Sequence, residues 1–360
     1  MFFIKAIILA NLQKKFHSFA LFITFVGSFC DNIMEIANKA EIWFAVLNIY
    51  AASKRAESYW HKAEMKLHQI GVVFHGNRTG RSGNAMEITF DACMAGYRKF
   101  IAVGGDGTVH DVLNGIAAYL DWAEDAGRSM CFSDFTLSVI PVGSGNDWIK
   151  STGVPKDVCA AAEILAAGHV GRQDVVKMSV LDENDNEISC SYMVNVGGVG
   201  LDPRICEQVN RLKAQGKRGR ILYLTSLVHA IRHRKSSRIR VMCDGEIVFN
   251  GPFYSIAFGI GKYSGGGMRQ TPTAVLDDGL VDITVIPELP MKRILREVWR
   301  LFDGTFHKVP ELVTGKYKEV VVCPEGSVLE PIEVDGEVVG RGKARFQVVD
   351  SQINIVLPDC

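Results

Sequence analysis

The stretch Phe100-Ile101-Ala102-Val103-Gly104-Gly105-Asp106-Gly107-Thr108 joins four apolar residues directly to a glycine-rich turn. A short apolar run that ends in a turn is typical of a buried strand, so we expect the turn at the carboxyl end of a parallel strand. Glycine has no Cβ, which lets backbone N–H groups approach phosphate oxygens. The stretch predicts a phosphate-binding turn, although a plain strand-to-helix connection has the same pattern.

A second turn of this kind, Gly143-Ser144-Gly145-Asn146-Asp147, follows the apolar run at residues 136–142. Both turns follow a predicted strand, and both carry an aspartate that can hold a metal ion on phosphate oxygens. The pair therefore favours binding of nucleotide phosphates over two unrelated loops. We also expect Asp106 to cap the helix that follows it.

The order of the predicted elements indicates an α/β domain followed by a β-rich domain. The predicted strands of the first part are residues 41–47, 71–74, 100–103 and 136–142, and its predicted helices include residues 84–95 and 109–120. This alternation is typical of a parallel sheet covered on both faces. Short strands with Asp-Gly turns dominate after residue 171; they include residues 189–196, 247–249 and 254–260. We expect an open parallel α/β domain over residues 41–171 and an antiparallel β-sandwich over residues 172–360.

The composition is that of a globular protein in a reducing compartment. The chain has 360 residues, 48% of them hydrophobic, and a formal net charge of zero, so nothing global indicates nucleic-acid binding. Its nine cysteines form no Cys-x-x-Cys pair, which argues against a disulfide framework and a zinc site. Residues 211–240 hold ten Lys or Arg and no acidic residue. They predict either contact with an anionic membrane surface or a solvated basic face.

Residues 1–40 differ from the rest of the chain. Lys14 and Lys15 precede an apolar stretch at residues 19–29, which is too short to span a bilayer. Met34 opens a sequence that resembles an ordinary cytosolic start. We interpret this part as an extension that reflects a start assigned too far upstream or that associates with a membrane, and the sequence leaves both open.

Several motifs together resemble the catalytic domain of diacylglycerol kinases and of their sphingosine, ceramide and bacterial lipid kinase relatives, from about residue 41 to the C-terminus. The motifs are the two glycine turns, residues 195–202, Gly265-Gly266-Gly267-Met268, residues 276–282 and Asp335-Gly336-Glu337. The resemblance implies a first domain like that of NAD kinase and diacylglycerol kinase. It also implies ATP and Mg²⁺ in a cleft between the two domains.

The resemblance implies a set of nucleotide-binding residues around the two turns. They are Asn48, Thr79, Gly104, Gly105, Gly107, Thr108, Gly143, Ser144, Gly145 and Asn146. One family pattern is altered: Asn48 is followed by residues 49–53, Ile-Tyr-Ala-Ala-Ser, where Pro-x-x-Gly is expected. We expect this change to reshape the loop near the base or ribose.

Phosphorylation of an alcohol requires a carboxylate near the hydroxyl and positive charge near the transferred phosphoryl group. The resemblance implies that Asp335 is the general base, that Glu337 binds Mg²⁺ or water, and that Asp106 and Asp147 belong to the same catalytic network. Taken alone, Asp335-Gly336 is typical of a hairpin turn.

A second, structural Mg²⁺ site is implied at the loop of residues 276–282. Asp277, Asp282 and the Leu280 carbonyl are its expected ligands, and Asp174 is a weaker member of the acidic network. Oxygen ligands suit a hard cation, but a hairpin with solvated acids has the same sequence.

These observations predict an ATP-dependent lipid kinase that is cytoplasmic and peripherally membrane-associated, acts on a lipid substrate and does not bind nucleic acid. An NAD kinase or phosphofructokinase and a catalytically silent nucleotide or lipid sensor are the alternatives. The sequence leaves open which lipid accepts the phosphoryl group and whether the chain forms a homodimer.

Overall fold

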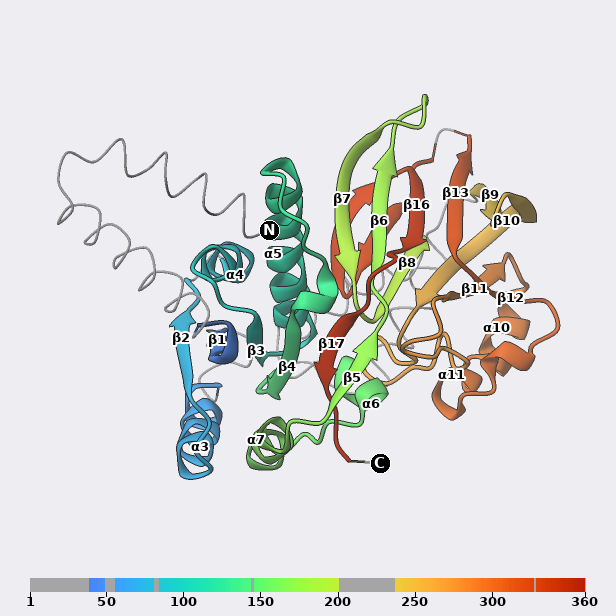
Figure 1. Ribbon diagram of the computed structural model, residues 1–360. Helices are drawn as coiled ribbons and strands as arrows, with labels where there is room; N and C mark the ends of the chain where they lie inside the picture. The colour runs from blue at the N-terminus through green and yellow to red at the C-terminus, as the bar shows by residue number, and fades with distance from the viewer. Residues whose placement is uncertain are drawn as a thin grey trace, which may run out of the picture.

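The computed structural model describes residues 39–48, 56–80, 84–143, 146–200, 237–326 and 328–359, and every structural statement below concerns these residues. They form two adjoining layers, an α/β sheet and a larger antiparallel sheet (Figure 1). Four sequence-based predictions fall largely or wholly outside the described residues. They concern the extension 1–40, the altered loop at residues 49–53, the basic segment 211–240, and Ser144 and Gly145 of the second turn.

The first layer is a six-stranded sheet in the order β2-β1-β3-β4-β17-β5. Its strands are β1 (Trp43–Leu47), β2 (Phe74–Arg78), β3 (Lys99–Gly104), β4 (Thr136–Pro141), β5 (Val170–Gln173) and β17 (Ile353–Val356). All neighbouring strands are parallel except β17 and β5. Strand β3 is almost wholly buried, as expected of a central strand covered on both faces.

Four helices in two pairs cover this sheet, and a fifth, short helix follows the second glycine turn. The helices are α3 (Ala56–Gln69), α4 (Ala85–Met94), α5 (Asp106–Asp125), α6 (Trp148–Thr152) and α7 (Val158–Ala167). Helix α3 packs against α7, and α4 packs against α5. The two pairs lie on opposite faces of the sheet, with α4 and α5 above the strands and α3 and α7 below them in the view of Figure 1. Because β3 and β4 are parallel neighbours, the two glycine turns that follow them lie at the same edge of the sheet.

The second layer is an antiparallel sheet of eleven strands, which confirms the predicted fold class. Its strands are β6 (Val176–Leu181), β7 (Glu187–Met193), β8 (Val196–Gly200), β9 (Arg238–Cys243), β10 (Glu246–Gly259), β11 (Val281–Pro287), β12 (Val313–Tyr317), β13 (Glu319–Glu325), β14 (Pro331–Val334), β15 (Glu337–Arg341) and β16 (Lys343–Val348). The first half of β10 pairs with β9, and its second half pairs with β8 and β11. Phe258 of β10 stacks on Phe346 of β16 in the core, with ring centroids 3.8 Å apart.

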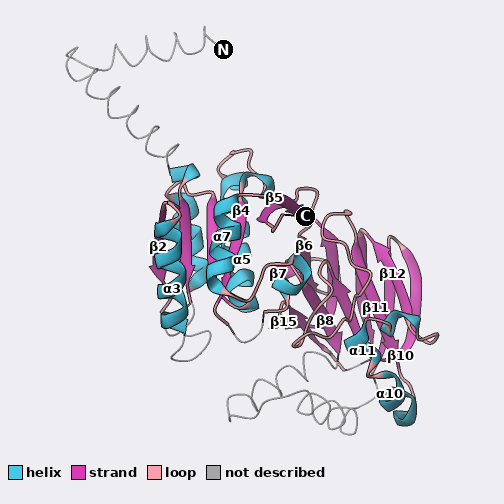
Figure 2. Cartoon of the chain, turned by 90° about the horizontal axis from the view of Figure 1, so that it is seen from below, coloured by secondary structure: helices cyan, strands magenta, loops and turns pink. Residues whose placement is uncertain are grey.

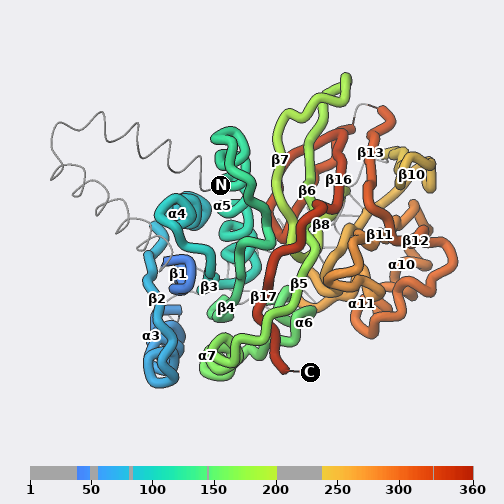
Figure 3. The backbone as a smooth tube through the Cα atoms, in the orientation of Figure 1, coloured from blue at the N-terminus to red at the C-terminus, as the bar shows by residue number. Residues whose placement is uncertain are grey.

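Three short helical elements lie at the outer edge of the second layer. They are α10 (Met291–Glu297), α11 (Arg300–Asp303) and the 3-10 turn η3 (Phe306–Lys308), and another 3-10 turn, η2 (Phe132–Asp134), precedes β4. The backbone tube shows α10 and α11 beside β11 and β12, at the side of the molecule away from β1 and β2 (Figure 3).

The strand boundaries differ from the sequence-based expectation in four places. The strand predicted at residues 71–74 is β2, which begins only at Phe74 and runs to Arg78. The strand predicted at residues 189–196 is two strands, β7 and β8, because the backbone N–H groups of Val194 and Asn195 donate to a carboxylate, Asp335, instead of a neighbouring strand. The strands predicted at residues 247–249 and 254–260 are the single strand β10. Strand β17, which the sequence pattern did not predict, returns the chain to the first sheet between β4 and β5.

Candidate active site

The first glycine turn leads directly into the N-terminal end of helix α5. Gly105 is the N-cap residue, and no side chain caps the helix. The expectation that Asp106 caps it is therefore wrong: Asp106 is its first residue. The first N–H groups of a helix have no intrahelical partner and carry partial positive charge. This end of a 20-residue helix can therefore receive a phosphate group.

The carboxylate of Asp106 links the first turn to the second. It accepts hydrogen bonds from the backbone N–H of Asp147, at 2.8 and 3.0 Å, and from that of Trp148, at 3.0 Å. The turns also touch through their backbones. A Cβ on Gly143 would lie 2.7 Å from the Cα of Gly105, so this position requires glycine.

The acidic residues predicted from three separate motifs influence one another electrostatically. Burial raises the pKa of Asp106 to about 6, against the lowering effect of its backbone hydrogen bonds. The charges of Asp147 and Asp335 add to the rise. The fold thus brings together carboxylates from α5, from the second turn and from the second layer.

Asp147 connects the second turn to a loop of the second layer. Its carboxylate is buried, pairs with the Lys150 ammonium at 2.5 Å and accepts the N–H of Gly266 at 2.6 Å. The Lys150 ammonium lies 6.0 Å from the centre of the Tyr263 ring. Lys150 therefore places positive charge beside the second turn, held by Asp147.

Asp335 lies in the tight turn between β14 and β15. Asp335 and Gly336 both have positive φ angles, 52° and 96°, which is typical of a two-residue hairpin turn. The same turn buries the Asp335 carboxylate, which accepts the backbone N–H groups of Val194 at 3.0 Å and Asn195 at 2.9 Å. The hairpin interpretation and a buried, oriented carboxylate are thus compatible.

His110 joins Asp335 to the first layer. It lies on α5 one turn after Asp106, and its Nδ1 is 3.2 Å from Oδ2 of Asp335. Burial disfavours the charged imidazolium, but the hydrogen bond and the negative charge of Asp335 more than offset this and raise the pKa of His110. Asp111 and Glu337 contribute smaller charge effects in the same direction.

Three residues predicted to bind nucleotide lie near the first turn. The Asn48 amide donates to the Thr108 hydroxyl at 3.1 Å. The hydroxyl of Thr79 is buried and has no hydrogen-bond partner among the described residues, so a ligand or water is required to satisfy it. Glu337 faces the same turn, because a Cβ on Gly107 would lie 3.5 Å from its Oε1.

A cavity of about 300 Å³ lies beside the second turn. Gly143 and Asn146 line it together with Tyr59, Lys62 and Lys156, which come from α3 and from the segment before α7. The Asn146 amide closes the turn by donating to the Gly143 carbonyl at 2.8 Å. The cavity therefore presents an aromatic ring and two cationic side chains next to a predicted phosphate-binding turn.

Comparison with known proteins agrees with this geometry. Residues 43–178 match the model of the diacylglycerol kinase catalytic domain, and residues 195–357 match that of the YegS C-terminal NAD kinase beta sandwich-like domain. The chain therefore carries a diacylglycerol kinase catalytic domain followed by a YegS-type C-terminal domain. A diacylglycerol kinase of Staphylococcus carnosus is 24% identical over 294 residues, which cover 82% of this chain and 88% of that protein. One from Staphylococcus aureus is 25% identical over 298 residues, with 82% and 86% covered.

Solved structures share the fold of this chain. A diacylglycerol kinase from Bacillus anthracis has a TM-score of 0.63 at 18% identity, with 88% of this chain and 97% of that chain covered. A second chain from the same organism has a TM-score of 0.68 at 21% identity, with 89% and 96% covered.

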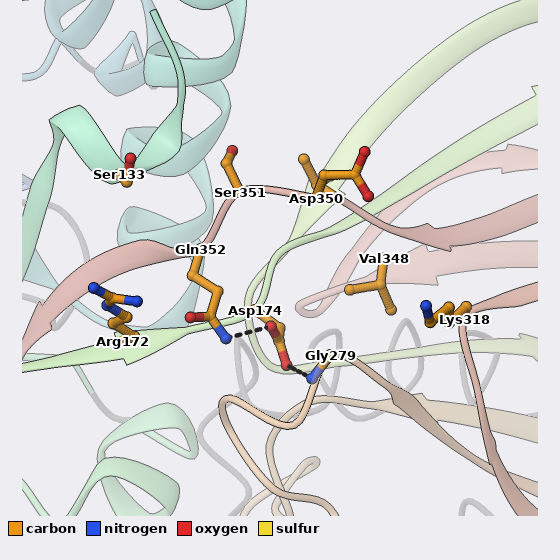
Figure 4. A pocket seen from close by; sticks show the side chains of 10 residues that line it. Ser133, Arg172, Asp174, Gly279, Lys318, Val348, Asp350, Ser351 and Gln352 are labelled. Atoms are coloured by element: carbon orange, nitrogen blue, oxygen red, sulfur yellow. Dashed lines mark hydrogen bonds between the residues drawn. The ribbon is translucent and has the colours of Figure 1, made fainter.

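The residues predicted for a structural Mg²⁺ site already have protein partners in this chain. The Asp174 carboxylate accepts the Gly279 N–H at 2.7 Å and the Gln352 amide at 2.9 Å, as Figure 4 shows. The Asp277 carbonyl accepts the same Gln352 amide at 3.1 Å. Asp174, Gly279 and Gln352 line one side of a cavity of about 480 Å³.

Lys316 supplies a positive charge where the resemblance implies a cation. Its ammonium lies 2.7 Å from a carboxylate oxygen of Asp278 and 3.2 Å from one of Asp282, whose other oxygen accepts the Thr273 hydroxyl. No cluster of three or more His, Cys, Asp or Glu side chains that could hold a metal occurs in the described part of the chain. The loop as folded therefore does not fit a divalent cation.

Sequence reasoning missed three residues that the fold brings to the candidate site. His110 had a readable signal, because it lies four residues after Asp106 and hence on the same face of α5. Lys150, three residues after Asp147, had a similar one. Asn195 lay within a recognised motif without an assigned role; its buried Oδ1 has no hydrogen-bond partner among the described residues.

Proposed function

We propose that this protein transfers the γ-phosphoryl group of ATP to a lipid hydroxyl, with Asp335 as the general base. One observation carries the proposal: Asp335 of the second layer contacts His110 on the helix that begins at the first glycine turn. This contact supports a single site in which a phosphate group at the helix end and a base for the acceptor are close together.

The nucleotide phosphates would bind at the uncapped N-terminal end of α5, against residues 105–108. Asn48, Thr79 and Thr108 would contact the nucleotide from the neighbouring strand ends. The unpartnered Thr79 hydroxyl and the glycine contact between the two turns support this assignment. Lys150 would offset negative charge on the transferred group from its position on Asp147.

Asp335 would take the proton of the acceptor hydroxyl. A carboxylate has about four acceptor positions, so the donors from Val194, Asn195 and His110 leave room for a hydroxyl. As the proton moves to Asp335, the acceptor oxygen bonds to the γ-phosphorus. The bond from that phosphorus to the β,γ-bridging oxygen breaks, and ADP leaves. His110 would orient the base and stabilise its charge.

Mg²⁺ that accompanies ATP neutralises charge on the phosphates and needs only one or two protein carboxylates. Glu337, which faces Gly107, is the residue we assign to it or to an ordered water. Asp106 and Asp147 are engaged by backbone N–H groups and Lys150, so we assign them the role of fixing the two turns. We assign no role in the reaction to the residues of the predicted structural Mg²⁺ site around Asp282.

The names of the Staphylococcus relatives support diacylglycerol as the first acceptor to test. We keep the proposal that the basic segment 211–240 contacts the membrane; its described members Arg238 and Arg240 pair with Glu325. No helix in the described ranges is long and apolar enough to cross a membrane.

The direct test incubates the purified protein with Mg²⁺, γ-labelled ATP and, in turn, diacylglycerol, ceramide, sphingosine and NAD. We expect label in a lipid. Asp335→Asn should lower kcat about a hundredfold or more, the usual contribution of a general base. Asp350→Asn, which neutralises an exposed carboxylate elsewhere, should leave kcat unchanged.

Other outcomes distinguish the alternatives. Label in NAD rather than in any lipid would assign a soluble-substrate kinase. Bound ATP without transfer to any acceptor would favour the sensor. Full activity of both Asp335→Asn and Asp335→Ala would reject Asp335 as the base even if a lipid is phosphorylated.

A further inference from the structure

The helical segment of residues 291–308, formed by α10, α11 and η3, is attached to the second layer by a small apolar core of its own. Val298, Leu301 and Phe306 are buried in it against Met268. The segment lies at the outer edge of the sheet, with α10 projecting beyond the strands (Figure 2). Its outer face is therefore available to a partner.

That outer face carries large apolar side chains. Leu295 is 41% exposed, and Trp299, four residues later, is 58% exposed. Residues four apart in a helical conformation lie on the same face, and Trp299 keeps helical dihedral angles. Trp is enriched where a protein meets the headgroup region of a bilayer, because its ring is apolar and its N–H is polar.

Basic side chains surround these apolar ones. The segment contains five Lys or Arg residues and two acidic ones. Arg293, Arg296 and Arg300 all pair with the same carboxylate, Glu297, at 2.5, 3.1 and 2.6 Å, and Arg293 also pairs with Glu311 at 2.8 Å. Two carboxylates do not neutralise three guanidinium groups, and the exposed Lys292 adds to the excess of positive charge. This face is complementary to an anionic surface.

The segment is coupled to the candidate active site through one loop. The Leu301 carbonyl accepts the backbone N–H of Arg269, and Met268 packs in the core of the segment. Two residues before Met268, the N–H of Gly266 donates to Asp147. A surface that binds this segment would thus also fix the position of the loop around Gly266, which contacts the second glycine turn.

We propose that residues 291–308 form a docking face for an anionic phospholipid bilayer, with Leu295 and Trp299 at the headgroup boundary and Lys292 and Arg296 on the lipid phosphates. The geometry and charge described above carry the proposal, and its consequence for catalysis rests on the proposed lipid kinase function. The binding is peripheral, as expected for an interfacial helical face that combines apolar and basic side chains.

Vesicle co-sedimentation of the full chain tests the docking face without requiring any activity. We expect the protein to bind vesicles of equimolar phosphatidylcholine and phosphatidylglycerol, and to bind pure phosphatidylcholine much less. The affinity of the double variant Lys292→Ser with Arg296→Ser for these vesicles should fall by about tenfold or more. The reason is that each basic side chain near an anionic surface raises the affinity severalfold. Leu295→Ser with Trp299→Ser should also lose binding.

Matched controls separate the docking face from general charge and hydrophobicity. Ile188→Ser removes a 66% exposed apolar side chain from β7, and Arg128→Ser removes an exposed charge after the end of α5. Both should bind vesicles like the unaltered protein. Circular dichroism melting of every variant shows that binding is lost without loss of the fold.

Activity with two forms of the acceptor completes the test. With a short-chain acceptor dissolved as monomers, the docking-face variants should keep their kcat, and with the acceptor in anionic vesicles their rate should fall. Normal vesicle binding by both double variants would overturn the proposal. So would a dimer in solution that the Trp299 change dissociates while vesicle binding persists. If no lipid is phosphorylated but vesicle binding follows the variants, the docking face stands and the proposed reaction fails.

Discussion

Asp106 is the residue whose ionisation most clearly reflects the way the two glycine turns are assembled. Its carboxyl loses its proton near pH 4 in an unfolded chain but, buried between the turns, has a pKa of about 6. Between these values the native state holds a proton that the unfolded state has lost. The contribution of Asp106 to stability therefore falls as the pH rises from about 4 to 6, by up to about 3 kcal/mol.

Urea unfolding of Asp106→Asn across this pH range checks that sign. As the pH rises, the free energy of unfolding of the unaltered protein should fall relative to that of the variant. Asp125→Asn, at the exposed end of the same helix, should show no such shift. A difference that stays constant with pH, or shifts the other way, would contradict the burial of Asp106 between the turns.

Single residues of the candidate site were predictable where a motif fixes them and unpredictable where the fold creates them. Asp106 and Asp335 stand in glycine turns whose backbone chemistry is visible in the sequence. His110 and Lys150 acquire their partners through helix spacing and long-range packing, which no local pattern signals strongly. The sequence around Asp106 suggested both a metal ligand and a helix cap. It could not show that the Asp106 carboxylate would accept hydrogen bonds from the other turn instead of capping its own helix.

At the scale of elements, the loop between residues 276 and 282 is held by a side-chain cation, the Lys316 ammonium, which pairs with Asp278 and Asp282. Lys316→Met would leave the buried Asp282 carboxylate without its positive partner and should lower the stability by about 2 kcal/mol. Vacating the lysine should also let Mg²⁺ or Ca²⁺ bind the loop. We therefore expect added divalent cation to raise the Tm of Lys316→Met more than that of the unaltered protein, measured without nucleotide.

Lys318→Met, two residues further along the chain, is the matched control and should respond to the cations like the unaltered protein. An equal rise in Tm for all three proteins would mean that the divalent cation binds elsewhere. A large rise in the unaltered protein, abolished by Asp282→Asn, would restore the metal site that the family resemblance implies.

Most elements could be predicted from the sequence. Buried parallel strands appear in it as continuous apolar runs, and exposed turns appear as Asp-Gly pairs. The misread elements have tertiary causes. The strand predicted at residues 189–196 is interrupted because Asp335 takes two of its N–H groups. Strand β17 has only four residues and owes its place to β4 and β5, from which it is far in sequence.

At the scale of the whole molecule, the account depends on how the two layers meet. The first layer contributes an uncapped helix end and two touching glycine turns; the second contributes Asp335, Glu337 and the loop around Gly266. The sequence predicted the two layers and their order. Local sequence patterns could not predict their contact, because the residues that make it are separated by more than a hundred positions. Only the family resemblance implied a shared site.

A crystal structure with Mg²⁺ and a non-hydrolysable ATP analogue is the measurement that tests this meeting of the layers most directly. We predict that the phosphates lie against residues 105–108 at the start of α5, with the terminal phosphate facing the Asp335 carboxylate and Thr79 in contact with the nucleotide. Phosphates bound away from this turn, or an Asp335 carboxylate that points away from them with no space for an acceptor hydroxyl, would contradict the account.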